Sequence, residues 1–82
     1  MPKVTLRQYI IYFRNEDEKL LGETDLPYMD ISVYQKLFKI DSDNPMYDSY
    51  PIGQLEAHFF KDQFDYEFDL EKCCYFFEQS LP

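Results

Sequence analysis

The single histidine, His58, and the adjacent cysteines Cys73 and Cys74 are the side chains that could form a nucleophile–base pair, whereas carboxylates that could act as acid or base are numerous and unselective. Nucleophilic catalysis needs a nucleophile, a base beside it and usually a third group that orients the base. No glycine-rich loop accompanies these residues to stabilise an oxyanion. We therefore expect His58 on the surface or at the edge of a helix, and we predict no enzymatic activity.

Metal and cofactor sites are also not expected. Neighbouring residues of a strand point to opposite faces, so Cys73 and Cys74 are poorly placed to share one ion. One of the two thiols is expected in the core. Asp41-Ser42-Asp43 begins like a calcium loop. The sixth position of that loop would be Met46 where glycine is required, so a calcium site of this type is rejected.

Carboxylates alternate with aromatic residues over residues 63–69. This alternation predicts a strand with one polar face, which carries Asp65, Glu67 and Asp69. Two interpretations stay open for that face. It is a solvated surface that discourages aggregation between strands, or it is an acidic stripe that meets a basic partner.

The segment 41–50 combines acidic residues with tyrosines and is the longest irregular stretch of the sequence. Tyrosines supply rigid contact area at protein interfaces, and long loops on small scaffolds often carry binding residues. The alternative is that Tyr47 and Tyr50 fold back to cap the core. The candidate partner-binding residues from both segments are Asp41, Asp43, Tyr47, Asp48, Tyr50, Asp65, Glu67 and Asp69.

Charge restricts the choice of partner. Sixteen acidic side chains against eight basic ones give a net charge of −8. Such a surface repels nucleic acid and anionic membranes and favours association with a basic protein. Solubility alone is the alternative reason for the charge. No stretch reaches the ~20 apolar residues of a membrane span, and no signal peptide is visible. Together with the absence of a disulfide framework, this predicts the cytoplasm.

The elements that must position these residues begin with two strands, 3–14 and 19–26, joined by a polar turn. The first strand is apolar on both faces, which is typical of a strand that is central or covered twice. Gly22 suggests a bulge or a close backbone approach. Asp30 is placed to cap a helix over 31–40.

A second helix is predicted over 51–62, with Pro51 at its first position and Ile52, Leu55, Phe59 and Phe60 on its apolar stripe. Residues 72–79 favour a final strand, and a helix stays open. The sequence thus predicts one α+β domain over residues 1–82. Its antiparallel sheet has three or four strands with two helices packed on one face, in the order β-β-α-α-β with a last segment that is β or α.

Residues 43–52 contain the motif Pro-x-Tyr-x-Ser-Tyr-Pro-Ile, and residues 75–78 read Tyr-Phe-Phe-Glu. With the hairpin and the helix, these segments resemble small acidic bacterial proteins that look like immunity proteins of polymorphic toxin systems, including contact-dependent growth inhibition. The resemblance implies an inhibitor that binds its cognate toxin, often a nuclease with a basic cleft, and blocks the active site. An acidic protein of phage or plasmid origin that mimics DNA is the alternative function, and a homodimer stays open.

Overall fold

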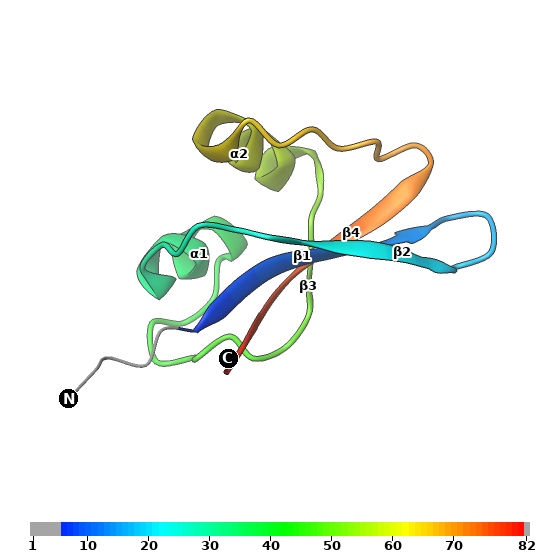
Figure 1. Ribbon diagram of the computed structural model, residues 1–82. Coiled ribbons are helices and arrows are strands. Elements are labelled where there is room, and N and C mark those ends of the chain that lie inside the picture. The colour runs from blue at the N-terminus through cyan, green and yellow to red at the C-terminus, as the bar shows by residue number, and fades with distance from the viewer. Residues whose placement is uncertain (1–5, 82) are drawn as a thin grey trace.

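In the computed structural model, residues 6–81 are described, and they form a four-stranded antiparallel sheet and two helices (Figure 1). The strand order across the sheet is β2-β1-β4-β3. The strands are β1 (Arg7–Arg14), β2 (Leu20–Asp25), β3 (Tyr50–Pro51) and β4 (Cys73–Ser80), and the helices are α1 (Ile31–Phe38) and α2 (Gln54–Phe64). The predicted α+β class and the sheet are confirmed. The expected first strand over 3–14 is described only from residue 6 onward, because residues 3–5 lie outside the described part, as do the ends of the predicted domain.

The hairpin of β1 and β2 has an irregular register. Tyr12 pairs with Gly22, whereas Phe13 pairs with Leu20, so Leu21 is the extra residue of a bulge. A Cβ atom on Gly22 would lie 3.1 Å from the hydroxyl of Tyr12. The bulge confirms one of the two expectations from the sequence, whereas the atoms close to Gly22 belong to the side chain of Tyr12 and not to another backbone.

Helix α1 begins at its predicted cap. The carboxylate of Asp30 accepts a hydrogen bond of 2.9 Å from the backbone N–H of Ser32. The helix ends two residues earlier than expected, because Lys39 adopts a left-handed conformation with φ of 59°. The N–H of Ile40 then returns to the carbonyl of Gln35, which satisfies the last turn.

Helix α2 begins later than predicted. Ile52 donates its N–H to the carbonyl of Tyr75 at 2.9 Å, so the chain stays extended beside β4 and Pro51 belongs to β3 instead of the helix. Gly53 is the N-cap, and its N–H donates to the carboxylate of Glu56. Leu55 was expected in the core but is 77% exposed. At 3.6 residues per turn it lies about 140° around the helix from the buried Phe60.

The predicted strand over 63–69 is wrong. Helix α2 continues to Phe64 and closes at Asp65, which has a φ of 55°, and residues 65–69 form no strand. The alternation itself is real, since Tyr66, Phe68 and Leu70 pack against the core while the carboxylates between them are exposed. Alternation of apolar and polar residues shows that one side of a segment is buried, but it does not show that the segment pairs with a strand. This segment crosses the helix-covered face of the sheet instead of pairing within it.

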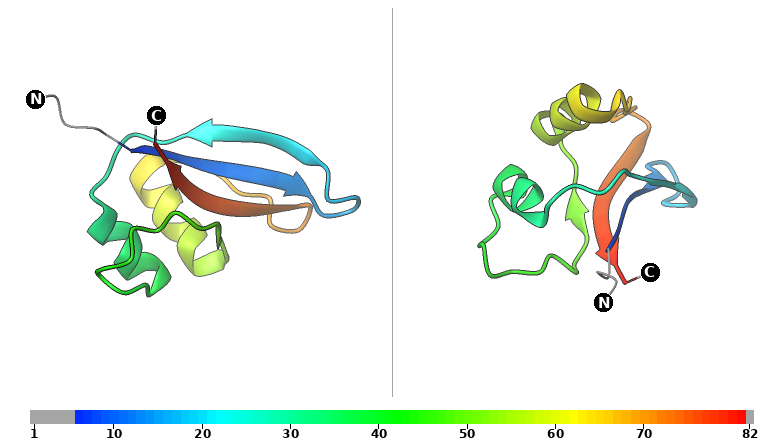
Figure 2. Two further views of the ribbon diagram at one scale, coloured as in Figure 1. Left: turned by 90° about the horizontal axis from the view of Figure 1, so that it is seen from below. Right: turned by 60° about the vertical axis from the view of Figure 1, so that its left-hand side comes forward.

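The last strand, β4, confirms the strand that was favoured over 72–79. It pairs with β1 from Arg7 opposite Ser80 to Arg14 opposite Cys73, and it occupies the centre of the sheet. Both helices lie on one side of the sheet (Figure 2). The core between them is largely aromatic, with Tyr34 of α1 stacked on Phe77 of β4 at 4.1 Å between ring centroids.

Candidate protein-binding surface

The loop between α1 and β3, residues 41–49, is fastened from inside by buried glutamines. Gln35 of α1 is buried, and its side-chain amide donates to the carbonyls of Ser42 and Asn44 at 3.1 and 2.8 Å. Gln79 of β4 is also buried, and its amide lies 3.3 Å from the carbonyls of Pro45 and Met46. Four backbone carbonyls of the loop therefore have hydrogen-bond partners in buried side chains.

Met46 is the point at which this loop turns. It adopts a left-handed backbone with φ of 58°, which is uncommon for a residue other than glycine. Its side chain is fully buried, and its N–H donates to the side chain of Asn44 at 2.8 Å. The strained backbone persists because the buried side chain and the hydrogen bonds around it hold the conformation.

The candidate residues of the loop separate into two kinds. Asp41, Asp43, Tyr47 and Asp48 are exposed, and Tyr47 is 56% accessible. Tyr50 instead turns toward the helices and packs against Phe38, with 5.7 Å between ring centroids. Burial, and then the charge of Asp48, raise the pKa of Tyr50 above its usual value. The alternative in which the tyrosines fold back to cap the core is therefore correct for Tyr50 and wrong for Tyr47.

The second predicted acidic group, after α2, is partly neutralised. Lys61 donates to Asp65 at 2.8 Å and to Glu67 at 3.0 Å. The hydrogen bond from Lys61 holds the pKa of Asp65 below its usual value. Asp69 is exposed. This segment and the loop 41–49 lie well apart in Figure 1, on opposite sides of the picture, so the structure does not bring the two predicted groups together.

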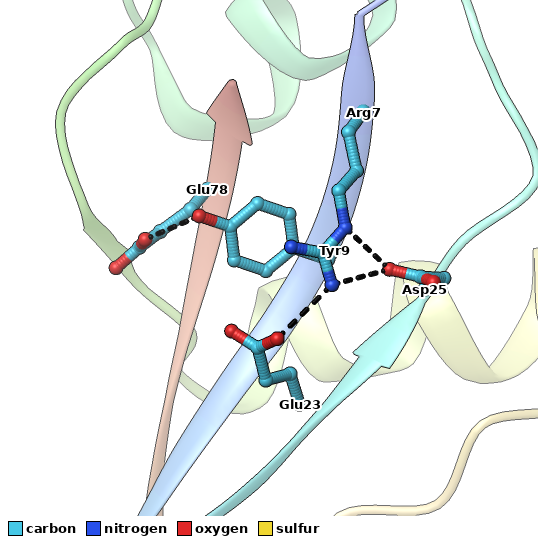
Figure 3. Close-up of polar contacts among 5 residues, drawn as sticks. All are labelled: Arg7, Tyr9, Glu23, Asp25 and Glu78. Atoms are coloured by element: carbon cyan, nitrogen blue, oxygen red, sulfur yellow. Dashed lines mark hydrogen bonds and ion pairs between the residues drawn. The ribbon is translucent and has the colours of Figure 1, made fainter. Parts of the chain in front are cut away.

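A polar network that the sequence analysis missed crosses the sheet (Figure 3). Arg7 donates to Asp25 at 2.7 Å and to Glu23 at 3.1 Å, and its guanidinium lies 4.0 Å from the ring centroid of Tyr9. The Tyr9 hydroxyl donates to Glu78 at 2.9 Å. Burial and the bond to Glu78 raise the pKa of Tyr9. The network consists of side chains on three neighbouring strands, so their contacts depend on the register of the sheet.

The loop and this network are continuous. The hydroxyl of Ser49, in the loop, donates to the carboxylate of Glu78 on β4. Glu78 therefore links the loop to Tyr9 on β1 and, through Arg7, to the edge strand β2. We call the side chains of Arg7, Tyr9, Glu23, Asp25 and Glu78 the rim.

The face of the sheet that carries the rim also carries an apolar row. Register places Ile11 beside Phe76, and Phe13 beside both Cys74 and Leu20, on the face opposite Ile10 and Phe77. The rings of Phe13 and Phe76 meet edge to face at 6.0 Å. Both helices lie on the other side (Figure 2). The row was signalled by a first strand that is apolar on both faces, and the predicted packing of both helices on one face of the sheet leaves the other face uncovered.

The residues with catalytic potential are not assembled with one another. His58 is exposed on α2 and lines a groove of about 400 Å³ together with Lys61 and Glu67. The cysteines are free and half-buried on β4. Within residues 6–81, no three side chains among His, Cys, Asp and Glu are grouped as metal ligands. The groove thus combines a histidine with an ion pair, and neither cysteine lines it.

The molecule is an acidic α+β domain whose antiparallel sheet has helices on one face only, over the part of the chain that the structure describes. It belongs to the family described as Domain of unknown function (DUF7683), which matches residues 7–78. No curated protein and no solved structure matches the chain. Neither helix formed by residues 6–81 is long and apolar enough to traverse a lipid bilayer.

Proposed function

We propose that this domain is an immunity protein that binds a cognate toxin domain in the bacterial cytoplasm and blocks its active site or substrate cleft. The observation that carries this proposal is the loop 41–49. Buried glutamines hold its backbone, while Tyr47 and the carboxylates of Asp41, Asp43 and Asp48 stay exposed. No catalytic step is assigned to the domain itself.

Preorganisation is the reason that such a loop favours binding. Ordering a flexible loop on association opposes binding, and a loop that is already fixed avoids most of that loss. Burying a glutamine is unfavourable unless its amide is hydrogen-bonded. Gln35 and Gln79 direct their amides to loop carbonyls. The buried side chains are thus used to define one conformation of an exposed segment.

Electrostatics support a basic partner. The net charge of −8 raises the rate of encounter with a positively charged surface, such as the substrate cleft of a nuclease. The loop presents an exposed aromatic side chain together with exposed carboxylates, and aromatic residues are frequent energetic centres of protein interfaces. The proposed mechanism is occlusion of the cleft in a heterodimer.

The alternative function, mimicry of DNA, has less support. A mimic needs rows of unpaired carboxylates that reproduce the charge of two phosphate strands. Here Arg7 binds two carboxylates of β2, and Lys61 binds two of the segment after α2. These ion pairs interrupt the acidic surface.

The proposal is tested by expressing the product of the neighbouring gene with and without the domain and measuring cell survival and complex formation. Reversing Asp41, Asp43 and Asp48 to lysine should slow association and weaken protection. A matched control reverses Glu16, Asp62 and Glu71, which are exposed acids outside the loop, and so changes the net charge equally. Equal loss of protection by both triple variants would show that only overall charge matters. Absence of any complex with the unaltered domain would overturn the proposal.

A further inference from the structure

The face of the sheet opposite the helices is the strongest unexplained feature of the molecule. Ile11, Phe13 and Phe76 lie side by side on it, and Leu20, at the edge, is 51% exposed. Antiparallel sheets commonly leave one face to water, but such a face is then usually polar. Here the apolar row continues over the three strands β2, β1 and β4.

The charge beside this row indicates what kind of molecule covers it. The rim contains three carboxylates and one guanidinium. Glu23 and Asp25 bind the guanidinium of Arg7, whereas Glu78 accepts from the hydroxyl of Tyr9. Arg7 is fully engaged in that network, so the rim as a whole is negative. A surface that fits it must present apolar side chains to the row and lysine or arginine side chains to the rim.

A second copy of the chain fits the face poorly. Two copies packed face to face would bring together two negative rims and two chains of net charge −8. Like charges that are brought together across an interface oppose association. A cationic protein surface has the complementary charge.

We propose that the open sheet face, from the rim to the row of Ile11, Phe13, Phe76 and Leu20, is a docking surface for a basic protein segment with apolar anchor residues. The inference rests on the proposed function and extends it, because the bond from Ser49 to Glu78 joins this face to the loop 41–49. The partner would then contact the loop and the sheet face together. The apolar row supplies area that leaves water on binding, and the rim orients the partner.

The test uses two short capped peptides of equal length and charge as probes. One alternates lysine with phenylalanine, and the other alternates lysine with serine. They are titrated into the isotope-labelled domain while backbone amide shifts are followed. We expect the phenylalanine peptide to shift the amides of β1 and β4 around Ile11 and Phe76, and the serine peptide to bind this face at least about tenfold more weakly.

The variant Phe76→Ser should weaken binding of the phenylalanine peptide by about tenfold. The matched control is Leu55→Ser, which removes an exposed apolar side chain on α2 and should leave binding unchanged. If Phe76→Ser unfolds the domain, the milder Leu20→Ser at the exposed edge takes its place, with a smaller loss expected.

Three results would overturn the inference. Both peptides could bind alike, which would mean that charge alone attracts them. The shifts could be confined to the loop 41–49, which would leave the proposed function intact and remove the sheet face from the interface. Sedimentation could show a dimer that Phe76→Ser dissociates, which would make a second copy the occupant. Failure of the proposed function is detected separately, by lack of protection against the toxin.

Discussion

Gln8 and Gln79 face each other across the two central strands, and the side-chain amide of Gln8 donates a hydrogen bond of 2.9 Å to the side-chain carbonyl of Gln79. Both residues are buried. Gln8 also exchanges two hydrogen bonds with the backbone of Met29, and Gln79 donates to the loop carbonyls. One pair of amides in the core therefore positions two separate connections of the chain.

The first prediction concerns this pair. Gln79→Leu should lower the free energy of unfolding by about 2–4 kcal/mol, because it removes one of the two acceptors of the Gln8 amide and the donor shared by two loop carbonyls. The total free energy of unfolding of a small domain is roughly 5 kcal/mol, so the loss would be visible in urea unfolding followed by circular dichroism. The control Gln63→Leu changes an exposed glutamine of α2 and should stay within about 0.5 kcal/mol. Equal unfolding midpoints for the two variants would contradict the role of Gln79.

The second prediction concerns the hydroxyl of Tyr34, which is buried without a hydrogen-bond partner among the described residues. Burial raises the pKa of Tyr34 from 10.0 to about 12. A pKa raised by folding contributes stability that is complete below pH 10.0 and is lost as the pH rises toward 12. Tyr34→Phe should be as stable as the unaltered domain or more stable by up to about 1 kcal/mol at neutral pH.

Urea unfolding at several alkaline pH values measures this effect. Tyr34→Phe should lose less stability than the unaltered domain between pH 10.0 and 12. Some loss should persist, because burial also raises the pKa values of Tyr9 and Tyr75. The exposed Tyr47→Phe is the control and should follow the unaltered domain. If the free energy of unfolding of Tyr34→Phe falls as steeply with pH as that of the unaltered domain, Tyr34 is not the source of the effect.

The third prediction concerns the end of α1, where Lys39 has a left-handed backbone. Glycine adopts this conformation without steric strain, so Lys39→Gly should raise the free energy of unfolding by about 0.5–1 kcal/mol. Lys36→Gly, one turn earlier in the same helix, should lower it by about 1 kcal/mol because glycine is unfavourable inside a helix. The opposite signs of the two changes, measured by thermal unfolding, provide the check.

The fourth prediction compares two tyrosines of equal exposure. Tyr47 in the loop is 56% accessible, and Tyr28, before α1, is 55% accessible. Neither Tyr47→Ala nor Tyr28→Ala should change the melting temperature appreciably. Tyr47→Ala should weaken binding to the cognate toxin by about 10–100-fold, as expected for an aromatic residue at the centre of an interface. If calorimetry shows the same affinity for both variants, Tyr47 is not a contact residue.

Local signals in the sequence were sufficient for much of the fold. Asp30 marks the start of α1 by its capping side chain, and Gly22 marks the bulge of the hairpin. Both signals act over a few residues, so sequence alone reveals them. The aromatic character of residues 72–79 correctly favoured β4, because aromatic side chains suit a half-buried pleated surface.

The errors arose where distant residues decide the structure. Ile52 stays extended because its N–H reaches Tyr75 in β4, so α2 starts at Gln54 and not at Pro51. Residues 65–69 alternate between half-buried and exposed side chains as a strand would, but no strand within residues 6–81 pairs with them. The rim combines Arg7 and Glu23, which are 16 residues apart, with Glu78 near the other end of the described residues, and no local pattern links them. The exposed loop acids were identifiable by composition, whereas the buried glutamines that hold the loop were not.

The pairing of β1 with β4 has a consequence for how this domain is assembled. It joins Arg7 to Ser80, so the middle of the sheet closes a loop that contains nearly every other described residue. A contact of such high sequence separation forms late and slowly, because the entropy of the long loop must be overcome first. The hairpin of β1 and β2 alone would be marginal in water. Removal of residues 73–80 should therefore leave an unfolded chain and not a smaller domain.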